Sequence, residues 1–385
     1  MASVPGSDPD HSTAASGRSP LDVSRLPGSD PDLHDLQPRV WVLFGKGTGG
    51  NGQMQSLAEV LGWPYEIKQL RHNALNLVPN ILLGASKLTL DEKQSSPLLP
   101  PWPDLVIAAS RRSSPVAQWI RRQSGGRTRL VHLLHAQAPL GRFDLVITMP
   151  QFCLPERDNI LHVTGVLNRI DPAAMSEAAA AWAPRLAQLP RPWTAILAGG
   201  NSSAYLLDPG TAARLGRDAS RMARERGGSL LVTTSPRTPP DAADALIAAV
   251  DAPSFAYKWK KDDAANNPYK GFLALADDFI VTIDSASLLV EASATGRPAA
   301  VFEWPRRGGA NAASRRRPWW WHSAVALGLF KPPRDFDAYF SEMRRRGLAH
   351  RFGEQPPSQR RPLDDLERSV ERVRALFDEE RRHRQ

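Results

Sequence analysis

Short apolar runs recur along the sequence, and each is followed by a small-residue turn or a helical pattern. Apolar runs without alternation are typical of strands that are buried on both faces. Apolar residues at helical spacing follow the run Arg39–Phe44 as far as Leu61, and they follow the run Asp104–Ala109 from Ser114 to Gln123. Strands that alternate with helices predict a parallel, doubly wound sheet. The first series of strands is expected at Arg39–Phe44, Asp104–Ala109, Leu130–Leu134, Phe143–Thr148 and Ile160–Gly165.

A second series of the same kind begins at Trp193. Its strands are expected at Trp193–Ala198, Ser229–Thr234, Phe255–Lys258, Phe279–Ile283 and Ala299–Phe302. Its helices are expected at Pro209–Arg226, Asp241–Val250, Gly271–Ala276 and Leu288–Thr295. We therefore predict an α/β protein with two Rossmann-like, doubly wound domains that face a central cleft, because ligands of open α/β sheets bind at the carboxyl ends of the strands.

The remaining segments mark the domain boundaries. Residues 1–37 are rich in Ser, Pro, Asp and Gly and are predicted to be a disordered tail. We expect an N-terminal domain at 38–170, a helical linker at 171–192 and a C-terminal domain at 193–350. A helical segment is expected at 351–385, since apolar residues recur at helical spacing within Leu363–Arg384. This helix either crosses back onto the body of the protein or contacts a partner.

The composition narrows the range of partners. The chain of 385 residues has 49 Lys and Arg against 40 Asp and Glu, a net charge of +9, which favours an anionic partner. No nucleic-acid-binding motif accompanies the charge, so nucleic acid is not expected. The single cysteine, Cys153, excludes an internal disulfide. Neither a bilayer-spanning apolar stretch nor a secretory signal is visible, which predicts a cytoplasmic protein.

The segment Ala276–Pro298 carries the strongest candidate chemistry. It places the turn Asp284–Ser287 between a strand and a helix that contains Glu291. Unpaired N–H groups at a helix N-terminus favour anions, so the segment predicts a site for the phosphates of a donor. Ser285 and Ser287 are expected to donate to phosphate, and Glu291 to accept hydrogen bonds from sugar hydroxyls. Their alternative roles are helix capping and a solvated acid.

Other turns of the second series are expected to complete this donor site. Gly199–Ser203 combines glycines with hydroxyls, which can surround a diphosphate without steric conflict, or it is only a tight turn. Arg237, Lys258 and Lys260 are the candidate cations. The predicted donor-binding residues are Gly200, Asn201, Ser202, Ser235, Arg237, Lys258, Asp284, Ser285, Ser287 and Glu291.

The first series contains the turn GKGTGGNGQ, Gly45–Gln53. Its spacing is neither that of a P-loop nor that of a dinucleotide-binding turn, although Glu66 lies about twenty residues further on. We expect an acceptor-side loop here, formed by Gly47, Thr48, Gly49, Gly50 and Asn51.

Two histidines lie near the end of one expected strand of the first series. His135 is the candidate catalytic base, because transfer to a hydroxyl acceptor requires a group that takes its proton. A structural or acceptor-contacting role for His135 is the alternative. His132 and His135 are expected on opposite faces of the strand, with no further His or Cys beside them, so no metal site is predicted.

Together these motifs resemble known families. Phe279–Phe302 is similar to the donor-binding segment of two-domain glycosyltransferases of the GT-B type, and especially to that of murein N-acetylglucosaminyltransferase. The motifs SPRTP (235–239), KWKKDDAANNPYKGFLALAD (258–277), DSASLLVEA (284–292) and GKGTGGNGQ resemble the mitochondrial fission "elongated mitochondria" family. The bacterial members of this family are described as candidate glycosyltransferases. The resemblance covers residues 39–352.

The resemblance implies a metal-independent glycosyltransferase that needs no cofactor. The C-terminal domain would hold a nucleotide-sugar donor, and the N-terminal domain a cell-envelope polysaccharide or lipid-linked acceptor. Plant members of the family are associated with organelle division, so a non-catalytic adaptor built on the same scaffold is the alternative. A dinucleotide-dependent oxidoreductase, the third class, would need a fingerprint that is not intact here.

The segment Pro305–His322 contains five Arg and then three consecutive Trp. Cations beside tryptophans suit phospholipid headgroups, a lipid-linked acceptor or stacking on sugars. The alternative is a basic loop followed by tryptophans that pack against the domain. We predict peripheral attachment to the inner face of a membrane from this segment.

Overall fold

The computed structural model describes residues 37–167, 171–202, 204–304, 320–329 and 334–384. The expected tail, 1–37, lies outside these ranges except for its last residue. Within the described ranges, the strands form two six-stranded sheets in which every neighbouring pair is parallel. The predicted α/β class with two doubly wound domains is therefore confirmed.

The first sheet is built from residues 40–162. Its strands lie in the order β2 (Tyr65–Gln69), β1 (Val40–Phe44), β3 (Leu105–Ala108), β4 (Arg129–Leu133), β5 (Leu145–Thr148) and β6 (Ile160–His162). Every residue of β1, β3 and β5 is buried, as expected for strands that are covered on both faces. The order places β1 directly beside β3, so the turns that follow these two strands lie beside each other at the carboxyl edge of the sheet.

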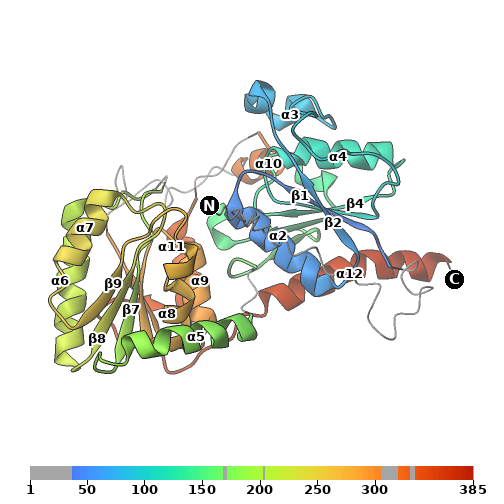
Figure 1. Cartoon of the computed structure of the whole chain (residues 1–385). Helices are drawn as coiled ribbons and strands as arrows, with labels where there is room; N and C mark the ends of the chain where they lie inside the picture. The colour runs from blue at the N-terminus through green and yellow to red at the C-terminus, as the bar shows by residue number, and fades with distance from the viewer. Residues whose placement is uncertain (1–36, 168–170, 203, 305–319, 330–333, 385) are drawn as a thin grey trace, which may run out of the picture. The chain divides into compact units, whose positions relative to one another are not determined.

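Helices cover both faces of the first sheet. The helix α2 (Thr48–Leu61) packs on β1, β3 and β4, and α4 (Ser113–Gln123) packs on β3 and β4. Figure 1 shows these two helices on opposite sides of the strands. The short helix α3 (Asn80–Leu83) and the 3₁₀ helices η2 (Ala74–Leu77), η3 (Leu140–Arg142) and η4 (Pro150–Phe152) lie in the connections.

The second sheet also consists of six parallel strands, in a different order. Its strands lie in the order β12 (His350–Arg351), β11 (Ala299–Phe302), β10 (Asp278–Thr282), β7 (Trp193–Leu197), β8 (Ser229–Thr233) and β9 (Ser254–Tyr257). In Figure 1, α6 and α7 lie on one side of these strands, and α8 and α9 lie on the other. The connections contain α6 (Pro209–Glu225), α7 (Pro240–Ala248), η5 (Ala264–Asn266), α8 (Tyr269–Leu275), α9 (Ala286–Ala294), α10 (Trp321–Ala326) and α11 (Phe336–Arg345).

Local signals explain where the helices begin and end. The helix α6 starts with Pro209, and the side chain of Asp208 accepts a hydrogen bond from the backbone N–H of Thr211 at 2.9 Å. The helix α2 ends at Gly62, which has a φ of 72° and adopts the left-handed conformation that favours glycine.

Two helices lie at the points where the chain passes between the sheets. The expected linker contains α5 (Pro172–Leu186), which packs on α8 through Trp182 and Phe272, with ring centroids 6.2 Å apart. The C-terminal helix α12 (Asp365–Arg384) packs on α2 and β5 of the first sheet. Of the two roles expected for the C-terminal helix, the structure shows the return onto the body of the protein.

Candidate functional site

Three turns meet at the carboxyl edge of the second sheet. Gly199–Asn201 follow β7, Ser235–Thr238 follow β8, and Asp284 and Ser285 follow β10. Because β10, β7 and β8 are neighbours in a parallel sheet, their carboxyl ends lie side by side. The structure thus brings together three groups of predicted donor-site residues.

Asp284 connects these turns to one another. Its carboxylate is fully buried, accepts a hydrogen bond from the backbone N–H of Gly200 at 2.8 Å and forms an ion pair with Nη1 of Arg237 at 2.9 Å. Burial raises the pKa of the Asp284 carboxyl, while the Arg237 charge and the Gly200 N–H act in the opposite direction. The buried carboxylate of Asp284 therefore holds the turn at Gly200 and the side chain of Arg237 in place.

The two glycines of this turn are explained by close packing. A Cβ atom on Gly199 would lie 2.4 Å from Oδ2 of Asp284, and one on Gly200 would lie 2.0 Å from the backbone oxygen of Arg237. Any side chain at Gly200 would displace the neighbouring turn, because a backbone atom cannot rotate away as a side chain can. Approach of the turns to one another is thus sufficient reason for both glycines.

The polar side chains of these turns bond largely to the backbone. Oγ of Ser235 donates to the carbonyl of Gly199 at 2.7 Å. Oδ1 of Asn201 accepts from the N–H of Leu207 at 2.9 Å, and Oγ of Ser202 accepts from the N–H of Tyr205 at 3.1 Å. These contacts connect the polar side chains of the turns to the surrounding backbone.

The remaining predicted donor residues occupy different surroundings. Ser285 is buried immediately before α9, and Ser287 is in the first turn of that helix. Glu291 lies further along α9 and accepts a hydrogen bond from the hydroxyl of Tyr269 at 2.6 Å. Burial, followed by the Glu291 charge, raises the pKa of Tyr269 well above its ordinary value. Lys258 is paired with Asp244 of α7 at 2.6 Å.

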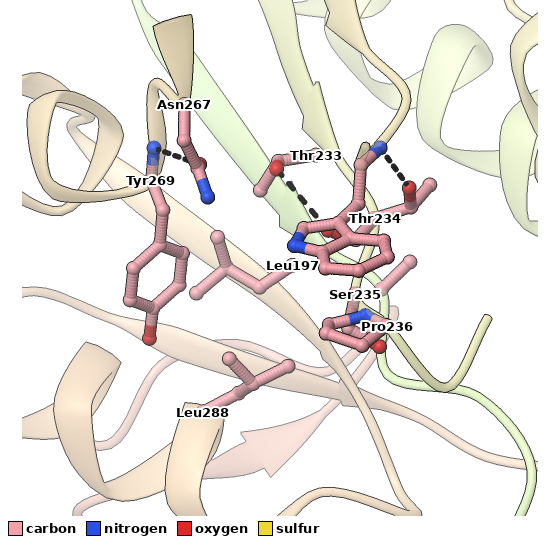
Figure 2. Close-up of a pocket in the computed structure, with 10 residues that line it drawn as sticks. Leu197, Thr233, Thr234, Ser235, Pro236, Asn267, Tyr269 and Leu288 are labelled. Atoms are coloured by element: carbon pink, nitrogen blue, oxygen red, sulfur yellow. Dashed lines mark hydrogen bonds between the residues drawn. The ribbon is translucent and has the colours of Figure 1, made fainter. Parts of the chain in front are cut away.

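A pocket of about 190 Å³ opens beside the turns at the ends of β7 and β8. Figure 2 shows Tyr269 on one side of it and Pro236 on the other, with Leu288 below. Threonine and serine hydroxyls and one amide accompany the apolar groups. The lining is completed by Leu197, Ala198, Thr233, Thr234, Ser235, Trp259 and Asn267.

Only Ser235 of the ten lining residues was among the predicted site residues, and the nine others include Trp259, Tyr269 and Leu288. Trp259 and Tyr269 both lie within the motif KWKKDDAANNPYKG, where aromatic residues separated by a polar loop are the visible signal. Leu288 resembles an ordinary core residue of a helix, and nothing in the sequence around it indicates that it lines a pocket.

The glycine turn of the first sheet is held by Asn51. Its side chain accepts from the N–H of Gly45 at 3.1 Å and donates to the carbonyl of Gly45 at 2.9 Å. Gly47 precedes α2, Thr48 and Gly50 are in its first turn, and both Gly47 and Gly49 are exposed. The predicted acceptor-side residues therefore surround the N-terminus of α2, with Asn51 bonded to the turn.

The two histidines of the first sheet have different environments. His132 lies in β4 and is fully buried, with Nε2 3.2 Å from Oγ of Ser114. Burial, partly offset by a contact with the carbonyl of Ser110, lowers the pKa of His132 to about 4. His135 lies beyond the end of β4 and lines a second pocket, of about 140 Å³, together with Arg111 and Arg334.

Some expectations concern segments that lie outside the described residues. The basic part of the Arg and Trp segment, 305–319, is one of them, whereas Trp320 and Trp321 are described at the start of α10. Of the helices in the described ranges, none combines the length and the apolar character needed to cross a membrane. In the same ranges, no group of three or more His, Cys, Asp or Glu side chains is arranged to hold a metal ion.

Two parallel, doubly wound sheets with turns at their carboxyl edges define an α/β protein of two Rossmann-like domains. The sequence model of the family Mitochondrial fission ELM1 matches residues 48–316. The chain belongs to this family, as its motifs predicted.

Two curated proteins illustrate the relationship. Mitochondrial fission protein ELM1 of Arabidopsis thaliana is 30% identical over 225 residues, which are 51% of this chain and 50% of the plant protein. The match thus spans half of that relative's own length. The uncharacterized protein RP120 of Rickettsia prowazekii (strain Madrid E) is 24% identical over 299 residues, 69% of this chain and 83% of that protein.

Among solved structures, the chain is similar to UDP-GlcNAc 2-epimerase from Neisseria meningitidis bound to UDP-GlcNAc. The TM-score is 0.45 at 11% identity, covering 88% of this chain and 100% of the other. It is also similar to ADP-heptose lps heptosyltransferase II of E. coli, with a TM-score of 0.39 at 13% identity, covering 89% and 99% of the two chains. No role for this chain follows from likenesses of this strength.

Proposed function

We propose that the chain is a glycosyltransferase whose nucleotide-sugar donor binds at the carboxyl edge of the second sheet. The observation that carries this proposal is the pocket lined by Trp259 and Tyr269, which lies directly beside the N-terminal end of α9. An aromatic pocket next to unpaired helix N–H groups suits a ligand with a flat ring at one end and phosphates at the other.

The pocket is proposed to hold the base of the nucleotide. Its volume of about 190 Å³ is smaller than the roughly 300–1,000 Å³ of pockets that enclose whole drug-sized ligands. A single ring system fits that size, with aromatic faces to stack on and with hydroxyl and amide groups of Thr233 and Asn267 to meet the polar edge of the base.

The diphosphate is proposed to lie at the start of α9. The N–H groups of the first turn have no partner within the helix, and the helix dipole favours negative charge there. Ser285 and Ser287 supply hydroxyls at the same place. Glu291, held by the Tyr269 hydroxyl, is positioned one turn further on to accept hydrogen bonds from sugar hydroxyls. This arrangement would stabilise a departing nucleoside diphosphate without a cofactor or metal ion.

The acceptor is proposed to approach from the first sheet, and a cell-envelope polysaccharide or a lipid-linked sugar is the proposed class. In the reaction, the acceptor hydroxyl loses its proton to a base and forms a bond to the anomeric carbon, while the bond from that carbon to the diphosphate breaks. His135 is the proposed base, since it lines a pocket at the edge of the first sheet. We place the reaction in the cytoplasm, at the inner face of a membrane.

One observation favours the alternative, a non-catalytic adaptor. Five leucines in the connection between β2 and β3 are more than half exposed, namely Leu75, Leu77, Leu82, Leu88 and Leu99. Large apolar side chains that are exposed in this number are candidates for a surface that binds a protein or a membrane. An adaptor needs such a surface and does not need a nucleotide pocket, so ligand binding separates the two functions.

The test is a calorimetric screen of nucleotides and nucleotide sugars against the purified chain. We expect one nucleotide class to bind. Trp259→Ala should reduce the binding affinity for that nucleotide about tenfold or more, because stacking on an aromatic side chain contributes about 1–3 kcal/mol. Glu291→Ala and Ser285→Ala are expected to weaken it as well. Tyr65→Ala, which removes an exposed aromatic side chain from the edge strand β2, is the control and should bind normally.

The outcome decides between the two functions. If no nucleotide binds to the folded protein, or if the three site variants all bind like the wild type, the donor site is refuted and the adaptor becomes the better account. In that case Leu77→Ser and Leu82→Ser should abolish association with a membrane or protein partner.

A further inference from the structure

The second pocket, at the edge of the first sheet, has an unusual set of charges. It measures about 140 Å³ and is lined by the side chains that follow β3, β4 and β5 and by Arg334, which precedes α11. Arg111, His135 and Arg334 supply three basic groups, and Gln137 supplies an amide. The described residues that line it include no carboxylate. A pocket of this composition repels cations and attracts anions.

The two arginines come from distant parts of the chain and are positioned by separate contacts. Nη2 of Arg111 donates to the carbonyl of Val78 at 3.0 Å, which fixes the direction of that side chain. The guanidinium of Arg334 lies 5.7 Å from the centroid of the Phe152 ring. Next to Arg334, the N–H of Asp335 donates to the carbonyl of Gln151 at 2.9 Å. The fold therefore holds both guanidinium groups at one pocket.

Positive charge extends beyond the pocket. Partial withdrawal from water, followed by the nearby Arg237 guanidinium, lowers the pKa of Arg334. At the neighbouring strand ends, Arg112 and Lys46 contribute to the lowered pKa of His72, whose main cause is burial. Like charges that the fold holds together destabilise one another, and an anion placed among them relieves this repulsion.

The backbone at the rim is also in an uncommon conformation. Among the described residues other than glycine, four have a positive φ. Leu134 (φ 71°) and Gln137 (φ 48°) line this pocket, and Cys153 (φ 48°) follows its lining residue Phe152. For a bulky residue such as Leu134 the left-handed conformation costs free energy, and residues in strained conformations gather at binding sites, where the surrounding structure maintains them.

We propose that this pocket binds a phosphate monoester and that the phosphate belongs to the acceptor. Two guanidinium groups present planar sets of N–H donors that match phosphate oxygens, and the His135 ring and the Gln137 amide add further hydrogen-bonding groups. The phosphate site itself rests on the residues of the pocket. Only its assignment to the acceptor rests on the proposed glycosyltransferase function.

The first experiment measures binding of inorganic phosphate to the full chain by calorimetry. We expect Arg334→Gln to weaken binding about tenfold or more, because a hydrogen bond to a charged group contributes about 1.5–3 kcal/mol. Arg351→Gln is the matched control, since it removes an arginine that is paired with Glu303 on the second sheet. Arg111→Gln is also expected to weaken binding, but it loses the contact with Val78. Arg334→Gln therefore carries the test, with thermal unfolding to verify its fold.

Further arms identify the source of the phosphate. A soluble sugar phosphate is compared with vesicles that contain phosphatidic acid, a lipid phosphate monoester, and with vesicles of phosphatidylglycerol, a diester. Preference for either monoester, lost in Arg334→Gln, supports the proposal and names the source. Acetate that binds as tightly as phosphate, or phosphate binding that Arg334→Gln leaves unchanged, overturns it.

The failure of this inference is distinguishable from failure of the proposed function. Trp259→Ala is expected to lose nucleotide binding and to retain phosphate binding. Arg334→Gln is expected to lose phosphate binding and to retain nucleotide binding. If phosphate binds in this manner but no nucleotide does, the phosphate site is confirmed, and the assignment of the phosphate to a glycosyltransferase acceptor is refuted. If a nucleotide binds but phosphate does not, the donor site stands and the phosphate pocket is refuted.

Discussion

The buried carboxylate of Asp365 accepts a hydrogen bond from the backbone N–H of Thr164, 201 positions earlier in the chain, at 2.9 Å. The N–H of Gly165 donates to the same carboxylate at 2.8 Å. These bonds join the start of α12 to the segment that leaves the first sheet after β6. One side chain thus stabilises both the departure and the return of the chain.

Replacement of Asp365 by Ala is expected to lower the free energy of unfolding by about 2–3 kcal/mol, because two buried backbone N–H groups lose their acceptor. The measurement is urea denaturation followed by circular dichroism. Glu367→Ala, on the exposed side of the same helix, is the control and should change the free energy of unfolding by less than about 0.5 kcal/mol. Equal losses in the two variants would contradict the role given to Asp365.

Two glycine substitutions are expected to have effects of opposite sign. Gly200→Ala places a Cβ atom against the backbone of Arg237 and should destabilise the protein by about 1–3 kcal/mol, as overpacking does. Gly52→Ala lies in α2, where an added Cβ meets nothing within 4 Å, and should stabilise by about 0.5–1 kcal/mol through helix propensity. Thermal unfolding of both variants tests this. A tolerated Gly200→Ala would mean that the two turns pack less closely than described.

The buried His132 predicts a loss of stability in acid. The unfolded chain takes up a proton at this residue below about pH 6.5, whereas the folded chain does so only near its pKa of about 4. The contribution of His132 to the free energy of unfolding is therefore fully present above pH 6.5. It falls by about 3 kcal/mol as the pH decreases to 4, since each unit of pKa shift corresponds to about 1.4 kcal/mol.

The difference between wild type and His132→Gln isolates this contribution. The variant should show a flatter dependence of unfolding free energy on pH between 6.5 and 4. Asp284 and Asp365 have raised pKa values and act with the opposite sign, since their stability contribution decreases as pH rises above the ordinary carboxyl pKa. They are present in both proteins and cancel in the comparison. Parallel pH profiles would exclude His132 as the cause.

Tyr269→Phe tests the contact between the first pocket and α9. Loss of the hydroxyl that donates to Glu291 at 2.6 Å should reduce the free energy of unfolding by about 1.5–3 kcal/mol, as expected for a hydrogen bond to a charged group. The substitution should also reduce the affinity of the pocket for any nucleotide that it binds. Tyr257→Phe removes a hydroxyl bonded to the partly exposed Asp263 at 3.0 Å and should cost less than half as much. A larger loss in Tyr257→Phe would be evidence against the buried contact.

Most of the fold is visible in the sequence because the inner strands are continuous apolar runs. Two strands were not predicted, and both lie at the edge of a sheet. β2 reads YEIKQ and is largely exposed, and β12 has only two residues, His350 and Arg351. Edge strands are covered less and need fewer apolar residues, so their composition resembles that of a loop. Their pairing depends on the strand beside them.

The candidate site was predictable in its position and less so in its contacts. The turns at Gly199, Ser235 and Asp284 follow strands, and parallel topology alone brings them to one edge. The sequence does not reveal that the Asp284 carboxylate faces inward to Gly200 and Arg237, because this depends on the approach of two separate turns. The same holds for Arg111 and Arg334, which meet at one pocket only through the tertiary fold.

The return of α12 to the first sheet means that the second Rossmann-like domain is an insertion within the first. The chain enters the second domain between β6 and α5 and returns to the first domain between β12 and α12. A protein truncated after β12 would lack the helix that covers α2 and β5, and would expose apolar surface on the domain that it was meant to preserve. Separate expression of the first domain therefore requires joining residues near 165 directly to α12, and exchange of the second domain between relatives requires two junctions.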